Sequence, residues 1–220
     1  MATGCKFLDF LIGDLENDIV TTIYGQGGSG KTGTCMLVAA ETAKNKGKVL
    51  YIDTEGGFST ERLKQVTGDD FEIVLSRINF IKPTSFSEQK KVLEKLKETI
   101  SDDIKLIVMD TIAMLYRLEL GKSEEVFEVN RELGRQLSYL TEIARKKKIP
   151  VLVTNQVYSN FENGIRMVGG DLLFYGSKCV IEIIKGQNSM RRAILKKHRS
   201  LEENKNVVFK ITQSGMSCKN

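Results

Sequence analysis

Apolar and polar positions follow two different patterns along the chain. Short, mostly apolar runs have the length and composition of buried β-strands, and they span residues 19–24, 48–53, 78–82, 105–110 and 150–156. Segments that repeat apolar residues with the period of an α-helix lie between them, at residues 31–46, 59–67, 85–100 and 124–148. Because strands and helices take turns, the pattern predicts an α/β fold with a mainly parallel, twisted sheet flanked by helices.

Local signals support the helix boundaries. Gly47 is a common stop after a helix. The sequence 85-SFSE-88 has the spacing of a capping box, in which Ser85 and Glu88 satisfy each other's backbone N–H groups at a helix start. The longest helix carries an apolar stripe that we interpret as core packing, at Leu133, Leu137, Leu140 and Ala144.

The pattern changes in the last part of the chain. After a glycine-containing loop at residues 157–170, three apolar runs follow at 178–184, 191–197 and 207–212, with no helical segment between them. Strands that are joined by short connections pair antiparallel. We therefore expect an antiparallel C-terminal extension of the sheet.

The composition fits one globular domain. With 220 residues the chain is long enough for a single α/β core, so we expect residues 1–220 to form one domain. No apolar run is as long as a membrane span, and the first residues lack a secretion signal. The four cysteines lie far apart without metal-binding spacing, which favours a cytoplasmic protein without a zinc site. A net charge of +5 is compatible with an anionic partner.

The sequence 25-GQGGSGKT-32 gives the strongest chemical signal. It has the spacing G-x4-G-K-T between a predicted strand and a predicted helix, which is the setting of a phosphate-binding loop, or P-loop. Glycines let backbone N–H groups point at phosphate oxygens, while Lys31 reaches the β- and γ-phosphates and Thr32 ligates Mg²⁺. A chance glycine turn is the alternative, and the spacing counts against it. The predicted nucleotide-binding residues are Gly25, Gln26, Gly27, Gly28, Ser29, Gly30, Lys31 and Thr32.

Two acidic residues follow later strands. Asp110 ends the run KLIVMD, where a carboxylate beside a P-loop can hold Mg²⁺ through a water molecule. Glu55 follows the run KVLYID, where it can polarise a water for attack on a γ-phosphate, although a solvated loop acid fits that position equally well. The absence of an Asn-Lys-x-Asp motif, which reads guanine, counts against a GTPase.

Four separated motifs resemble those of the RecA-type recombinases. They are 51-YIDTEGGFSTERL-63, 115-LYR-117, 152-LVTNQV-157 and 168-VGGDLL-173, and they follow the P-loop in the order found in the archaeal and eukaryotic strand-exchange branch. The resemblance runs from about residue 7 to residue 216. It implies a RecA-like P-loop NTPase core with ATP and Mg²⁺ as cofactors.

The resemblance also implies roles for individual residues. Glu55 would be the catalytic glutamate, and Gln156 would sense the γ-phosphate and couple the ATP state to the loop that follows. That loop, at residues 157–170, corresponds to the second DNA-binding loop of the family and holds one basic residue, Arg166. The segment after Arg117 corresponds to the first DNA-binding loop.

The chain departs from full recombinases in several places. Because the P-loop begins at residue 25, we expect no N-terminal DNA-binding domain, and none of the ten phenylalanines opens the Phe-x-x-Ala hook that links subunits. The first loop, at residues 118–128, is acidic and lacks the Gly-Arg-Gly of the family. Where full recombinases have an acidic segment that caps ATP across the subunit interface, this chain has Lys197, His198 and Arg199, in a basic segment that begins at Lys196.

Clustered cations neutralise DNA phosphates, so we expect DNA to bind at this basic segment, with a solvated basic hairpin as the alternative. Alternation along a strand would place Lys197 and Arg199 on one face.

These motifs predict an ATP-binding, DNA-binding protein of homologous recombination and DNA repair. We expect it to assist the main recombinase, with weak DNA-linked ATPase activity at most, and to bind single- or double-stranded DNA of any sequence. Expected protein partners are the main recombinase or a junction resolvase, with at most a small homo-oligomer and no long filament. Two alternatives stay open: a filament-forming strand-exchange recombinase, and a RecA-fold ATPase that acts on a protein substrate.

Overall fold

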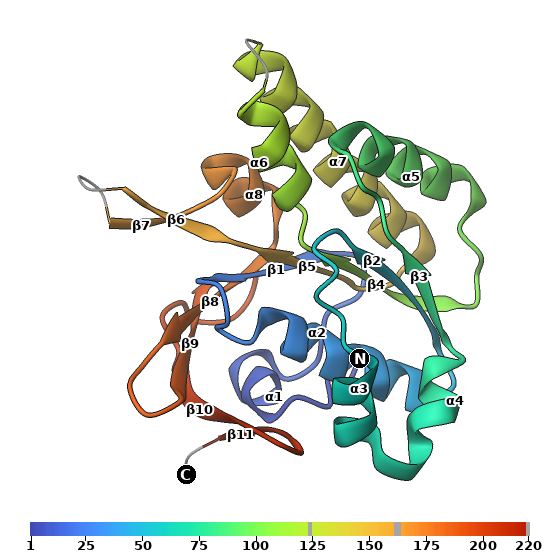
Figure 1. The fold of residues 1–220 in the computed structure, drawn as a ribbon, viewed down its shortest axis with the longest axis vertical. Coiled ribbons are helices and arrows are strands. Elements are labelled where there is room, and N and C mark those ends of the chain that lie inside the picture. The colour runs from blue at the N-terminus through green and yellow to red at the C-terminus, as the bar shows by residue number, and fades with distance from the viewer. Residues whose placement is uncertain (123–124, 161–163, 219–220) are drawn as a thin grey trace.

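The computed structural model describes residues 1–122, 125–160 and 164–218, which form a nine-stranded sheet between two layers of helices (Figure 1). The order across the sheet is β11-β10-β9-β8-β1-β5-β4-β2-β3. These strands are β1 (Val20–Gly25), β2 (Lys48–Asp53), β3 (Ile78–Ile81), β4 (Ile104–Asp110), β5 (Val151–Asn155), β8 (Cys179–Lys185), β9 (Met190–Lys197), β10 (Asn206–Thr212) and β11 (Gly215–Cys218). A separate hairpin, β6 (Val157–Asn160) and β7 (Gly164–Met167), projects from the edge of the molecule (Figure 1).

The helices cover both faces of the sheet. Below it in Figure 1 lie α1 (Lys6–Ile12), α2 (Lys31–Lys44), α3 (Thr60–Thr67) and α4 (Phe71–Leu75), with the short 3₁₀ helix η1 (Gly68–Asp70) between the last two. Above it lie α5 (Phe86–Thr99), α6 (Met114–Leu120), α7 (Val126–Lys147) and α8 (Gly170–Gly176). The predicted helix at 124–148 is α7, and its first predicted residue, Glu124, lies outside the described residues.

Pairing confirms the predicted α/β sheet and shifts one boundary. Strands β3, β2, β4, β5, β1 and β8 are parallel, and β9, β10 and β11 continue the sheet antiparallel. We expected residues 178–184 to start the antiparallel extension, but β8 pairs parallel with β1. The reason is α8, a helix between β7 and β8 that the sequence pattern did not reveal. The antiparallel extension therefore begins at β9.

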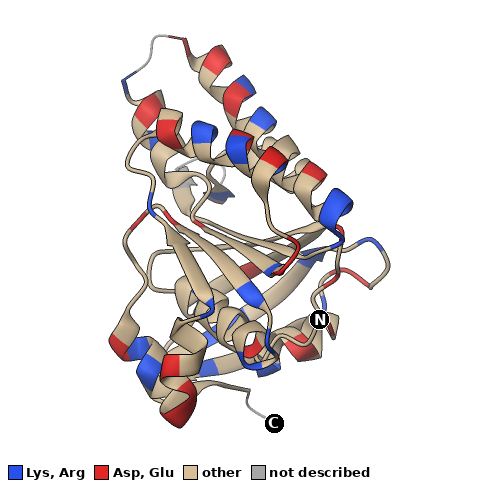
Figure 2. Cartoon of the chain, turned by 90° about the vertical axis from the view of Figure 1, so that its right-hand side faces the viewer, with Lys and Arg blue, Asp and Glu red and all other residues tan. Residues whose placement is uncertain are grey.

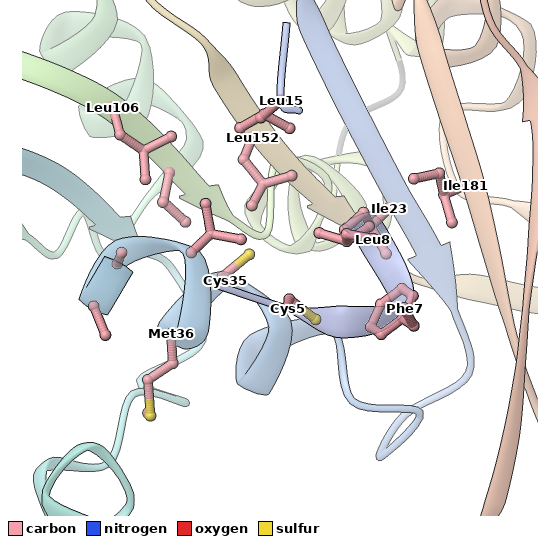
Figure 3. Close-up of a cluster of buried hydrophobic side chains, with 14 of the residues drawn as sticks. Cys5, Phe7, Leu8, Leu15, Ile23, Cys35, Met36, Leu106, Leu152 and Ile181 are labelled. Carbon is pink, nitrogen blue, oxygen red and sulfur yellow. The ribbon is translucent and has the colours of Figure 1, made fainter. Parts of the chain in front are cut away.

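Each central strand is buried on both faces because two cores sandwich the sheet. Alternate residues of β1 point to different cores, with Ile23 below the sheet and Val20 and Tyr24 above it. Figure 3 shows the lower core, in which side chains from α1, α2 and the strands meet. In this core the rings of Phe7 on α1 and Phe209 on β10 stack with 4.2 Å between their centroids. Thus α1, which was not predicted, joins the antiparallel extension to the main sheet.

The start of α5 differs in detail from the predicted capping box. The Ser85 hydroxyl accepts a hydrogen bond from the Glu88 N–H at 3.1 Å, as expected. The Glu88 carboxylate, however, accepts from the N–H and hydroxyl of Thr84, at 2.7 and 2.9 Å, and not from Ser85. The cap is shifted by one residue because the Thr84 side chain offers Glu88 a second donor.

The outer helices carry mixed charge. In the view of Figure 2, basic and acidic residues alternate along the helices above the sheet. Ion pairs join α5 to α7, with Lys90 to Glu132 at 3.3 Å and Lys97 to Glu142 at 2.8 Å. None of the helices in the described part of the chain is long and apolar enough to cross a membrane.

Candidate nucleotide-binding site

The P-loop joins β1 to α2 at the carboxyl edge of the parallel strands. Gly30 is the N-cap of α2 and has a φ of 108°, in the left-handed region that glycine tolerates. At Gly25 a Cβ would lie 2.3 Å from the carbonyl oxygen of Ile183 on β8, so a side chain has no room there. Two glycines of the motif are therefore required by the backbone itself.

The Lys31 side chain crosses the P-loop, where a bound phosphate would also lie. Its ammonium donates to the carbonyl oxygens of Gly25 at 2.9 Å and Gln26 at 3.1 Å, and its side chain is buried. Burial lowers the pKa of Lys31, while the nearby carboxylates of Glu55 and Asp110 oppose that shift. The buried Ser29 hydroxyl in the same loop has no hydrogen-bond partner. A buried cation and an unpartnered hydroxyl beside exposed glycines fit a loop that receives phosphate oxygens.

Asp110 is held rigidly at the end of β4. One carboxylate oxygen accepts from the Tyr51 hydroxyl at 3.0 Å, and the other accepts from the Thr154 hydroxyl. Tyr51 comes from β2 and Thr154 from β5, the two strands that flank β4. A buried, ionisable oxygen pair at this edge suits a Mg²⁺ ion held through water, with Thr32 as the other predicted ligand.

Glu55 and Gln156 are 101 positions apart in the sequence and are in direct contact. The Gln156 side-chain amide donates to Glu55 Oε1 at 2.6 Å, and the Thr111 hydroxyl donates to the same oxygen at 3.1 Å. The predicted catalytic residue and the predicted sensor thus meet at the carboxyl edge beside the P-loop. A charge on Glu55 in this position can reach Lys31 and any phosphate that Lys31 binds.

The loop that carries Glu55 is organised by Asp53, a residue that sequence reasoning missed. Asp53 Oδ1 accepts from the N–H groups of Glu55, Gly56 and Gly57, at 3.2, 2.8 and 3.2 Å. The signal was present, because an Asp followed closely by two glycines commonly folds back on its own backbone. Asp53 therefore positions Glu55 through the backbone of this loop.

Gln156 connects this site to the projecting hairpin. Its carbonyl oxygen accepts from the Val168 N–H at 3.0 Å, and the side chain of the preceding Asn155 donates to the Val168 carbonyl oxygen at 2.6 Å. Val168 follows β7, so both ends of the β6–β7 hairpin are tied to the end of β5. A shift of the Gln156 backbone would therefore also shift the base of the β6–β7 hairpin.

The predicted DNA-binding residues fall into two separate places. Arg117 lies exposed on α6, and Arg166 lies exposed on β7. Arg166 also lines a cavity of about 280 Å³ with Tyr24, Asp171 and Phe174. The predicted first loop, at residues 118–128, is only partly a loop, because residues 118–120 end α6 and residues 126–128 begin α7; residues 123 and 124 lie outside the described residues.

The basic segment at residues 196–199 lies at the opposite, amino edge of the sheet, because β9 runs antiparallel to β8. Lys197 donates to the Phe174 carbonyl oxygen at 2.9 Å, and Arg199 pairs with Glu16 at 2.7 Å and Asp18 at 3.5 Å. β9 ends at Lys197, so strand alternation does not extend to Arg199. The expectation that Lys197 and Arg199 share one face is therefore wrong, because the two side chains contact different elements.

The other two residues of the basic segment are also engaged. Lys196 lies 3.9 Å from Glu182, and His198 Nδ1 accepts from the N–H groups of Ser200 and Leu201 at 3.2 and 3.1 Å. Burial lowers the pKa of His198, opposed by Glu16 and reinforced by Arg199. The four residues span the end of β9 and the turn that follows it, and carboxylates partly neutralise the charges of Lys196 and Arg199.

Comparison with known proteins gives one consistent result. The sequence profile of the Rad51 family matches residues 1–219. The "DNA repair and recombination protein RadB" of Methanococcus maripaludis is 42% identical over 213 residues, which are 96% of this chain and 97% of that protein. The protein with the same description from Methanocaldococcus jannaschii is 40% identical, over 94% and 97% of the two chains.

A solved structure gives the same picture. It is described as the crystal structure of the RadB recombinase, and it superimposes with a TM-score of 0.83 at 36% identity over 98% of this chain and 97% of that chain. These matches confirm the resemblance to RecA-type recombinases and the RecA-like fold that it implied.

Proposed function

Because this chain belongs to the Rad51 family and is similar along its length to RadB proteins of DNA repair and recombination, we propose that it is an ATP- and DNA-binding protein that assists the main recombinase. ATP with Mg²⁺ would bind at the P-loop, and DNA would bind without regard to sequence. ATP hydrolysis would be slow.

The contact between Glu55 and Gln156 is the observation that carries this proposal. Gln156 is bonded on one side to the acid beside the P-loop and on the other to the base of the β6–β7 hairpin. A side chain that exchanges one partner for another can act as a switch between two sites. The hairpin carries Arg166, a cation suited to a DNA phosphate.

The residues around the P-loop would each have a separate role toward bound ATP. Lys31 and the N–H groups of the P-loop would bind the phosphates, and Thr32 and Asp110 would hold Mg²⁺. Bound ATP would supply the phosphoanhydride bond and the negative charge to which these groups respond. Glu55 would orient a water molecule, but in this structure its Oε1 is occupied by Gln156 and Thr111. That occupation supports slow turnover.

The coupling is tested by measuring DNA affinity with and without ATP. Fluorescence anisotropy of a labelled oligonucleotide should show that ATP changes the affinity of the unmodified protein severalfold. Gln156→Ala should keep ATP binding and lose that dependence, while Gln65→Ala, on an exposed surface of α3, should behave like the unmodified protein. Equal DNA affinity in both nucleotide states would show that the proposed coupling is wrong.

The assisting role needs a separate test with the main recombinase. Small amounts of this protein should increase strand exchange by that recombinase, while the protein alone should form no long filaments in electron micrographs. Strand exchange by this protein alone would favour the recombinase alternative, and failure to bind any DNA would favour an ATPase that acts on protein.

A further inference from the structure

The hairpin between β8 and β9 reaches back to the P-loop. Asn188 and Ser189, at its tip, have φ values of 51° and 61°, as in the type I′ turns whose twist matches paired strands. The turn is closed by hydrogen bonds from Met190 N–H to the Gln187 carbonyl oxygen and from Gly186 N–H to the Met190 carbonyl oxygen, both at 2.9 Å. The two residues that flank this tip therefore have fixed positions.

Those two residues are both cations. Lys185 and Arg191 are direct partners in the β8–β9 register. Two residues further along each strand, Ile183 and Ala193 are buried in the core below the sheet, so the pair shares the face that looks toward α2 and its P-loop. Like charges directly opposite each other destabilise a strand pair. Another interaction must therefore offset the repulsion between these two cations, or the two charges must serve to bind a ligand.

The pair touches the P-loop at Gly28. Arg191 donates to the Gly28 carbonyl oxygen at 3.2 Å. A Cβ on Gly28 would lie 3.1 Å from the Lys185 Nζ and 3.4 Å from its Cε, so the ammonium rests on the tip of the loop. Lys185 is also close enough to Lys31 that its charge contributes to lowering the pKa of Lys31, behind burial as the main cause.

No carboxylate of the described residues neutralises this pair. The ion pairs of the described part of the chain include neither Lys185 nor Arg191, and the Arg191 Nε is buried without a hydrogen-bond partner. Three cations, Lys31, Lys185 and Arg191, thus gather around a loop whose residues 26–28 are exposed, and the last two cations have no carboxylate partner among the described residues. Such a cluster is a site for an anion with several charges.

We propose that Lys185 and Arg191 form an additional polyphosphate-binding subsite of the P-loop, supplied by the same chain. Lys185 provides a second cation for the phosphates beside Lys31, and Arg191 fixes the Gly28 peptide so that the loop stays open. This inference rests on the proposed ATP binding and adds the residues that strengthen it.

Nucleotide affinity tests the subsite directly. The dissociation constant of a fluorescent ATP analogue, and its displacement by inorganic tripolyphosphate, should be measured over a range of salt concentrations. Lys185→Met should weaken both ligands about tenfold at low salt, because a charge-assisted hydrogen bond is lost. The affinity of Lys185→Met for both ligands should also depend less on salt concentration than that of the unmodified protein. Lys185→Arg should restore most of the affinity. Arg191→Met should weaken both ligands by a smaller factor.

Arg192→Met is the matched control. Arg192 is exposed on the opposite face of β9, paired with Ile184, so its loss should leave both dissociation constants unchanged. Far-ultraviolet circular dichroism and thermal unfolding check that each variant is folded. If Lys185→Met does not fold, Lys185→Gln replaces it in the same measurements.

The outcomes separate this inference from the function on which it rests. Normal ATP and tripolyphosphate affinity in Lys185→Met, alongside a loss in Lys31→Ala, would overturn the subsite and leave ATP binding at the P-loop intact. Weaker DNA binding with unchanged nucleotide binding would also overturn it and assign the cations to DNA phosphates. No nucleotide binding by the unmodified protein would overturn both.

Discussion

The two ends of strand β9 carry similar charge in opposite settings. At its start, Arg191 and its partner Lys185 lie on the P-loop tip without a carboxylate partner among the described residues. At its end, Lys196 approaches Glu182, Lys197 contacts backbone carbonyls of α8, and Arg199 beyond it pairs with Glu16 and Asp18. The first end lacks negative charge, whereas the second supplies much of its own.

This difference indicates where each end obtains its counter-ion. Unneutralised cations beside a loop that binds anions favour a bound polyphosphate. Cations that already have protein partners must break those contacts before they can bind a DNA phosphate, so each contributes less than a free cation. We therefore expect large effects on nucleotide binding from changes at the carboxyl edge and smaller effects on DNA binding from changes at the amino edge.

The largest effect should come from Lys31→Ala. ATP affinity should fall at least about a hundredfold, since a buried cation that bonds the loop is removed together with its phosphate contacts. Isothermal titration calorimetry measures it directly. Lys196→Ala, at the other end of β9, should leave ATP affinity unchanged, and an equal loss in both variants would abolish the contrast between the two edges.

Glu55→Gln should reduce ATP hydrolysis about a hundredfold while ATP affinity stays the same. A glutamine at this position still accepts the hydrogen bond from Gln156, so the site keeps its geometry and loses only a base. Phosphate release under saturating ATP measures the effect, with Glu61→Gln, an exposed acid of α3, as the control. Hydrolysis at the parent rate would show that Glu55 is not the base.

At the amino edge, the triple change Lys196→Ala, Lys197→Ala, Arg199→Ala should weaken DNA binding about tenfold at low salt and flatten its salt dependence. ATP affinity should not change. The control is a triple change to alanine at three exposed lysines away from β9, which are Lys82 after β3 and Lys91 and Lys95 on α5. If the amino-edge variant instead lost ATP binding and kept DNA binding, these cations would serve the nucleotide of a neighbouring subunit.

The smallest effect concerns His198, the single histidine of the chain. Burial lowers its pKa below the usual 6.5, so between the folded-state pKa and 6.5 the unfolded chain binds more protons than the folded protein. The free energy of unfolding should therefore fall slightly as the pH drops through that window. A proton NMR titration of the imidazole should give a pKa below 6.5, and Arg199→Met should raise it. A pKa at or above 6.5 in the parent would contradict this prediction.

The regular part of the fold could be predicted because its strands are buried on both faces. The apolar runs of β1, β2, β4 and β5 are long enough to recognise, and their edges agree with the structure within a residue or two. The short helices α1 and α8, of seven residues each, are too brief to show a helical period. The strands of the β6–β7 hairpin have four residues each, which is too short for an apolar alternation to be recognised.

Site residues were predictable where a motif gives the chemistry and unpredictable where only tertiary contact does. The P-loop, Asp110, Glu55 and Gln156 were named from sequence, and the fold brings them to one edge. The bond between Glu55 and Gln156, across 101 positions, has no local signal. In the sequence, Lys185 and Arg192 are both cations of an exposed hairpin, and only the strand register places one on the P-loop and the other away from it.

The tie between Gln156 and Val168 has a thermodynamic consequence. Any coupling through it must be reciprocal, because a cycle of two binding equilibria has the same free energy in either direction. If nucleotide in the P-loop changes the affinity of the β6–β7 hairpin for its ligand by some factor, that ligand changes the nucleotide affinity by the same factor. DNA would then act as an effector of ATP, and the strength of the linkage could be read from either side.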